Sequence, residues 1–160
     1  MISDHISLEE ATRSSTAERL GIDNTPTEEI IEVMKLTVEA LFEPVRNHYG
    51  CRIAVPSFFR SEELNKALSN NGRVAASKKS QHMTGEAMDM DAQPYGGCTN
   101  KQVFEYIRDN LVFDQLIWEE GTDDEPEWVH ASHRSSEGAK NRKEVLRKFR
   151  TDGKTRYEKL

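Results

Sequence analysis

The segment SQHMTGEAMDMD, residues 80–91, places a histidine and two aspartates around a short turn. Apolar and polar residues alternate in GEAMDMDA, which predicts a strand with Asp89 on one of its faces. His82 precedes this strand, and Gly85 in between allows the chain to fold back so that the imidazole meets the Asp89 carboxylate. These two side chains could be two ligands of one metal ion, but a histidine beside an aspartate is a common arrangement, so a third ligand is needed.

The third ligand is predicted in EPEWVHAS, where Glu127 and His130 stand three residues apart at the edge of an expected strand. Two imidazoles and one carboxylate suit zinc, whereas calcium and magnesium prefer shells made of oxygen alone. Three protein ligands with one open position are typical of a catalytic zinc site. Glu127 would be free to act on a metal-bound water, and Glu119, which ends LIWE, is the alternative base.

Other residues with possible chemistry have simpler interpretations. Asp91 is expected to accept hydrogen bonds behind the ligands or to end the strand, and His133 either lines the cleft or lies on the surface. His5 and His48 are expected to be solvated, and Trp118 and Trp128 to lie in the core or in the cleft wall. Cys51 and Cys98 are expected to be free thiols without a metal role.

Length and charge limit the classes of function. The chain has 160 residues, enough for one domain with its own core. No segment approaches the ~20 apolar residues of a membrane span, and acidic residues stand where a signal peptide would be basic, so synthesis in the cytoplasm is expected. Residues 1–133 carry 12 Lys and Arg against 24 Asp and Glu, which argues against nucleic-acid binding.

The C-terminal segment has the opposite charge. Residues 134–160 carry 10 Lys and Arg against 4 Asp and Glu. We expect a basic, helical extension that is separate from a domain at residues 1–133, with its helix at about 137–150. Such a tail could dock on a virion or on the cell wall, although a solvated helix is the simpler interpretation.

Capping signals and periodicity predict the other elements. Ser7 with Glu10 begins a short helix that ends near Gly21, and Thr25 with Glu28 caps a helix to about residue 45. Ser61 caps a third helix, and Thr99 with Gln102 caps a fourth. Short strands are expected at 51–55, 85–92, 114–119 and 128–132. Helices followed by a mixture of strands and helices favour an α+β fold.

Several of these segments resemble one known family. SQHMTGEAMD fits the Ser-x-His-x-x-Gly-x-Ala-x-Asp signature of the zinc D-Ala-D-Ala carboxypeptidases, the Hedgehog-related peptidase group that includes bacteriophage endolysins. EWVH resembles the acidic-x-x-His element of this family, FDQLIWE its strand before the last ligand, and FFRSEELN its Tyr/Phe-Arg-Ser-x-x-x-Asn segment. The resemblance covers about residues 3–133. It implies a single domain in which helices flank a small, mainly antiparallel sheet.

The resemblance also implies roles for individual residues. His82, Asp89 and His130 would bind Zn²⁺, and Glu127 would be the general base and later the proton donor. Arg60 matches the arginine that this family places near the substrate carboxylate or carbonyl. The chain departs from the family at Ser57-Phe58, where a Ser-Gly pair is usual. A bulky residue at this position could narrow the pocket or move Arg60.

The implied function is hydrolysis of a peptide bond in bacterial peptidoglycan by a carboxypeptidase or an endopeptidase that a phage or prophage encodes. Such a protein would be released from the host cytoplasm to the wall or carried in a virion. A non-catalytic virion protein that keeps the fold is the alternative, because zinc can also serve stability alone. A non-haem iron oxygenase shares the ligand types, but its His-x-Asp spacing is absent and the expected strands are too few.

Overall fold

The computed structural model describes residues 1–70, 79–136 and 138–160. Its centre is a six-stranded sheet in the order β1-β2-β4-β3-β5-β6, and all neighbouring strands are antiparallel except β3 and β5. The strands are β1 (Ala54–Ser57), β2 (Ala87–Asp91), β3 (Gln115–Glu119), β4 (Trp128–Ser132), β5 (Glu144–Thr151) and β6 (Lys154–Lys159). The α+β fold and the mainly antiparallel sheet are confirmed.

The N-terminal segment forms two short helices instead of the single one expected. The Ser7 hydroxyl accepts a hydrogen bond from the Glu10 amide at the start of α1 (Leu8–Thr12). The Ser14 hydroxyl caps α2 (Ser15–Leu20) in the same way, and Gly21 ends α2 in a left-handed conformation. A second capping serine therefore divides the expected helix, since each hydroxyl satisfies an amide that lacks a helical partner.

The next helix is continuous but irregular. It runs through α3 (Glu28–Thr37), the π-helical turn η1 (Val38–Phe42) and α4 (Glu43–Tyr49). Its cap is Thr27, whose hydroxyl accepts from the Ile30 amide, so the expectation of Thr25 was wrong. Pro44 has no amide hydrogen for the preceding turn, and a π-helical turn at this point accommodates that loss.

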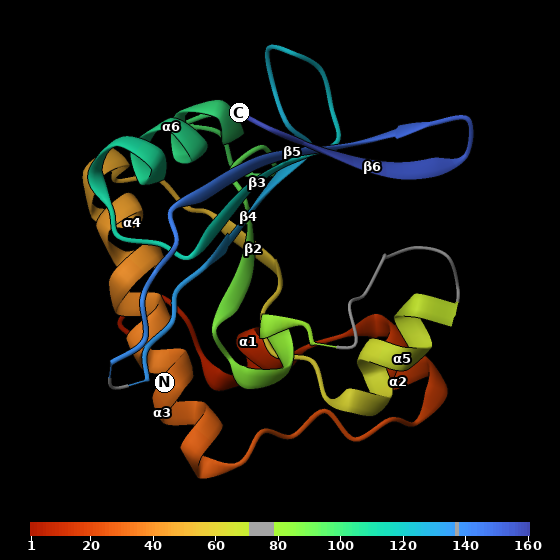
Figure 1. The fold of residues 1–160 in the computed structure, drawn as a ribbon. Helices are drawn as coiled ribbons and strands as arrows, with labels where there is room; N and C mark the ends of the chain where they lie inside the picture. Colours follow the sequence, from red (N-terminus) through yellow and green to blue (C-terminus); the bar gives the residue numbers. More distant parts are fainter. Residues whose placement is uncertain (71–78, 137) are drawn as a thin grey trace.

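Helices cover one face of the sheet. α3, α4 and α6 (Asn100–Asn110) lie together on one side, and α2 pairs with α5 (Glu62–Asn70) (Figure 1). The Phe104 ring of α6 meets the Trp118 ring of β3 edge to face, with centroids 5.3 Å apart. The helix-covered face is apolar and buried, and it contains Met88, Met90, Leu116, Trp118, Val129 and Ala131. By strand alternation, Asp89 and His130 lie on the opposite face.

The C-terminal segment is a β-hairpin, so the prediction of a helix at about 137–150 was wrong. β5 pairs in parallel with β3, and β6 pairs with β5. The turn residues Asp152 and Gly153 both have positive φ, 51° and 71°, as in the two-residue turns that match the twist of a hairpin. Because β5 continues the central sheet, the segment after residue 133 is part of the same folded unit.

Asp114 joins this C-terminal segment to the rest of the fold. Its buried carboxylate accepts hydrogen bonds from Arg142 at 2.8 and 2.9 Å and pairs with Arg134 at 3.1 Å. Gln81, beside His82, donates to the same carboxylate at 3.2 Å. Burial alone would raise the pKa of Asp114, but the arginines outweigh it and lower the pKa to about 2.

We expect Asp114→Asn to destabilise the protein by about 2 kcal/mol at pH 7, because the folded state holds the carboxylate ionised far more strongly than the unfolded chain does. This contribution is complete above pH 3.8 and disappears as the pH falls towards 2. The difference from wild type should therefore shrink on acidification. Urea unfolding from pH 7 down to pH 3 would measure it. Asp109→Asn, at an exposed carboxylate, is the control, and an equal loss in both variants would contradict the role of Asp114.

Candidate metal centre

The pairing of β2 with β4 brings two of the predicted ligands together. Asp89 lies directly opposite His130 in this antiparallel pair. Directly opposite residues have their Cβ atoms about 4.5–5.5 Å apart and point to the same face. The carboxylate and the imidazole therefore meet although they are 41 residues apart in sequence, and the Asp89 Oδ1–His130 Nδ1 distance is 2.9 Å.

The third predicted ligand comes from the turn before β2. His82 lies in the 3-10 helix η2 (Gln81–Thr84), which Gly85 ends with a φ of 75°. A Cβ at Gly85 would lie 2.7 Å from Met34 Cγ and 3.1 Å from the Ile30 carbonyl oxygen. Glycine is needed here for two reasons: the left-handed conformation and the close approach of α3. The expected turn is confirmed.

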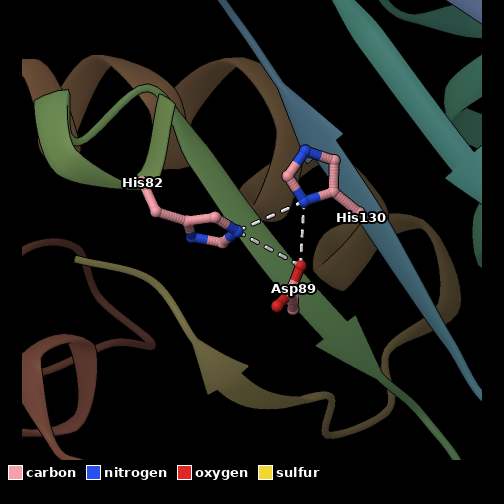
Figure 2. Close-up of side chains that lie close together, drawn as sticks. All are labelled: His82, Asp89 and His130. Carbon is pink, nitrogen blue, oxygen red and sulfur yellow. Dashed lines mark hydrogen bonds and ion pairs between the residues drawn. The ribbon is translucent and has the colours of Figure 1, made fainter. Parts of the chain in front are cut away.

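The three donor atoms have the spacing of a metal site (Figure 2). His82 Nε2 lies 3.3 Å from His130 Nδ1 and 3.5 Å from Asp89 Oδ1. Ligand atoms about 2.0–2.1 Å from a tetrahedral zinc ion are separated from each other by about 3.3 Å. The three distances, including the 2.9 Å between Asp89 and His130, fit that geometry, and the cluster could bind a metal ion.

The surroundings of His82 prepare its ring for this role. The backbone carbonyl of Phe58 accepts a hydrogen bond from Nδ1 at 2.7 Å, which leaves the lone pair on Nε2. Burial, reinforced by the Arg60 guanidinium, lowers the pKa of His82 from 6.5 to about 4. The imidazole is therefore neutral at pH 7, the form that a metal ligand requires.

Arg60 lies beside the cluster. Its Nη2 donates to Asp89 Oδ2 at 3.1 Å and lies 3.3 Å from His82 Nε2, while its Nε donates to the Ser57 hydroxyl at 2.7 Å. The two oxygens of Asp89 are thus divided, with Oδ1 directed to the histidines and Oδ2 to the arginine. Burial would raise the pKa of Asp89, but His82 and His130 hold it well below 3.8. The carboxylate is therefore ionised at pH 7, the form that a metal ligand requires.

A groove opens at the cluster. Its volume is about 580 Å³, and its walls include Asp89, Arg60 and Trp128 together with residues of α2 and α5. Phe59, not Phe58, lines it; the Phe58 side chain is 1% exposed and packs in the core. The residue that departs from the family pattern therefore contributes its carbonyl to His82 and keeps its ring away from the groove.

The structure separates the two candidate bases. Glu127 immediately precedes β4, its side chain is exposed, and its carboxylate forms no hydrogen bond or ion pair with any residue that the structure describes. Glu119 ends β3 and is 6% exposed. It lies on the same face as His130, because Glu119 pairs with Trp128 and Ile117 pairs with His130. The sequence indicated both carboxylates but not this difference in burial.

The other candidates lie outside the cluster. Asp91 accepts from Asn100 at 3.0 Å, as a strand-end carboxylate would. The His133 ring lies 3.3 Å from the Ser135 hydroxyl. Trp118 is in the core and Trp128 in the groove wall, both as expected. His5 forms an ion pair with Glu43, and His48 stacks on Tyr106. Lys148, which bonds to Glu119 at 2.8 Å, was not singled out in the sequence because it lies in the mispredicted tail.

Comparison with known proteins gives a family match over most of the chain. Residues 4–132 match the model of a family described as peptidase M15. No curated protein matches the chain. The matched range includes all three predicted ligands, Arg60 and both glutamates, whereas β5 and β6 lie beyond it. The chain therefore belongs to the peptidase M15 family of metallopeptidases.

Proposed function

We propose that the protein is a zinc-dependent peptidase that cleaves peptide bonds in the stem peptides of bacterial peptidoglycan. The observation that supports this most is the tetrahedral spacing of His82 Nε2, Asp89 Oδ1 and His130 Nδ1, together with a groove that Asp89 lines. A purely structural zinc site would use four protein ligands. Within the described residues the cluster holds three, which leaves a position for water or substrate.

Each residue has a role in this proposal. Bound zinc would supply a Lewis acid and lower the pKa of water towards about 7. Arg60 holds Asp89 in place and, on the groove side, offers a planar donor for a substrate carbonyl or carboxylate. A glutamate serves as general base: Glu127 is the one that the family pattern implies, and Glu119 is the alternative. Trp128 provides an apolar wall for the peptide.

The substrate and the setting belong to the same proposal. The groove contains the cations Arg13 and Arg60 and the acids Glu18 and Asp91, a mixture that suits a peptide carrying both charges. Either an endopeptidase or a carboxypeptidase cut is compatible with this groove. We propose a phage or prophage protein that reaches the wall by release from the host or within a virion. Among the described residues, no helix is long and apolar enough to cross a membrane.

Docking through the basic tail would use only some of its cations. Five of its cations form ion pairs with acidic residues: Arg134, Arg142, Arg147, Lys148 and Arg150. Attachment to an anionic wall polymer or to a virion would depend on the others, which form no ion pair in the described part of the chain: Lys140, Lys143, Lys154, Arg156 and Lys159.

We expect His130→Ala to weaken zinc binding by more than about a hundredfold, since even partners behind the ligands are worth 10–100-fold. His133→Ala is the matched control, three residues further on and outside the cluster. Titration of the metal-free variants with zinc, followed by elemental analysis, would measure the effect. Retention of one zinc ion by His130→Ala would rule out the proposed ligand set.

We expect the zinc-loaded protein to release new fragments from purified peptidoglycan, and a chelator to abolish them. Mass spectrometry of the fragments would identify the bond and so decide between a carboxypeptidase and an endopeptidase. Walls of several chemotypes should be included, because the groove alone does not name the stem peptide. Bound zinc without cleavage on any of them would favour the non-catalytic virion role.

A further inference from the structure

A second set of charged side chains lies next to the ligands on the same face of the sheet. Glu119 is directly opposite Trp128, and His130 is two residues further along β4. Such diagonal neighbours on an antiparallel pair are about 7–8 Å apart at the backbone, within reach of a long side chain. The Glu119 carboxylate is therefore beside the metal cluster and on its side of the sheet.

Lys148 reaches this carboxylate from the C-terminal hairpin. It lies opposite Glu119 in the β3–β5 pair, and its ammonium donates to Glu119 Oε2 at 2.8 Å. Both side chains are 8% exposed. The ammonium is also 5.7 Å from the centre of the Trp128 ring, which lines the groove. Lys148, which lies outside the residues that match the family, thus contacts both Glu119 and Trp128 next to the predicted ligands.

One oxygen of Glu119 is left available. Oε2 is held by Lys148, whereas Oε1 accepts no hydrogen bond from any residue that the structure describes. Burial raises the pKa of Glu119, although Lys148 and His130 oppose the increase. The titratable groups that surround Glu119 and Lys148 are Asp89 on β2, His130 on β4, Tyr157 on β6 and the adjacent Glu120.

Glu127 lacks these properties. Its side chain is exposed, and the described hydrogen bonds of Glu127 involve its backbone alone. The Glu127 amide donates to the Glu119 carbonyl, and the Glu127 carbonyl accepts from the Asn100 side chain. An exposed carboxylate without a described partner must be oriented before it can transfer a proton, whereas Lys148 already holds Glu119. Preorganised groups lose less entropy on reaching the reactive geometry.

We propose that Glu119 is the proton-transferring carboxylate of this centre and that Lys148, supplied by the C-terminal hairpin, is the residue that positions it. The inference rests on the proposed peptidase function. Glu119 Oε1 would take one proton from the attacking water as the water oxygen bonds to the carbonyl carbon of the substrate. It would then give that proton to the amine nitrogen as the C–N bond breaks. The reaction consumes one water molecule and involves no oxidation or reduction.

The first test compares Glu119→Gln with Glu120→Gln, a matched change at the adjacent and more exposed carboxylate. We expect Glu119→Gln to bind one metal ion and to lower kcat by about 10²–10⁴-fold with little change in KM, the contribution usual for a general base. Glu120→Gln should stay close to wild type, and Glu127→Gln should lose less than Glu119→Gln. Glu119→Asp, which keeps the charge, serves if the glutamine variant does not fold. Loss of turnover in Glu127→Gln alone would return the role to Glu127.

The second test concerns Lys148. Lys148→Met keeps the aliphatic stem and removes the charge, so it should lower kcat per metal-loaded, folded molecule. Lys148→Arg should restore most of that loss, because a guanidinium can still hold the Glu119 oxygen. A variant that loses thermal stability but keeps wild-type kcat would show that the Lys148–Glu119 pair only supports the fold.

A readout without turnover separates this inference from the function on which it rests. Cobalt(II) in place of zinc reports its surroundings through visible absorption, which can be followed against pH. We expect Glu119→Gln to alter this pH dependence, and Glu120→Gln to leave it as in wild type. An unchanged response in Glu119→Gln would overturn the inference. A changed response in a protein that cleaves no wall peptide would instead contradict the peptidase proposal and keep Glu119 beside the metal.

Discussion

The register between β2 and β4 is the constraint on which the centre depends. Asp89 and His130 meet only because they are directly opposite, and a slip of one residue would turn one of them to the helix-covered face. That face prevents the slip, since Met88 pairs with Ala131 and Met90 with Val129, all buried under the helices. Burial of apolar area on one face therefore fixes the positions of the donor atoms on the other.

The same coupling explains what could be predicted from the sequence. The alternation in GEAMDMDA and WVHAS reports the two faces of each strand, so Asp89 and His130 could be placed on the polar face without coordinates. Gly85 marked the turn that returns His82 to the strand, because its conformation and the contact with Met34 both exclude a side chain. The family signature added the pairing of segments that lie 41 residues apart, which periodicity alone cannot give.

The errors have physical causes as well. Residues 137–150 are rich in Lys, Arg and Glu, which favour helices when nothing else decides. In the folded chain this segment forms β5 instead, because the edge of β3 offers backbone hydrogen bonds and a surface to pack against, and this tertiary context outweighs the local preference for a helix. One local signal for the hairpin is present in the sequence, because Asp-Gly at residues 152 and 153 is a favoured two-residue hairpin turn. The burial of Glu119 could not be predicted because it depends on this strand.

The uneven charge of the chain has an internal explanation. Arg147, Lys148 and Arg150 of β5 pair with Asp123, Glu119 and Glu120, which lie at the end of β3 and in the loop after it. The exposed pairs contribute little to the stability of the fold, so the position of the hairpin does not depend on them. The Lys148–Glu119 pair differs because it is buried, and removal of one partner would leave a desolvated charge beside Asp89 and His130. A strand that only extended the sheet would need no such charge on the face that carries Asp89 and His130.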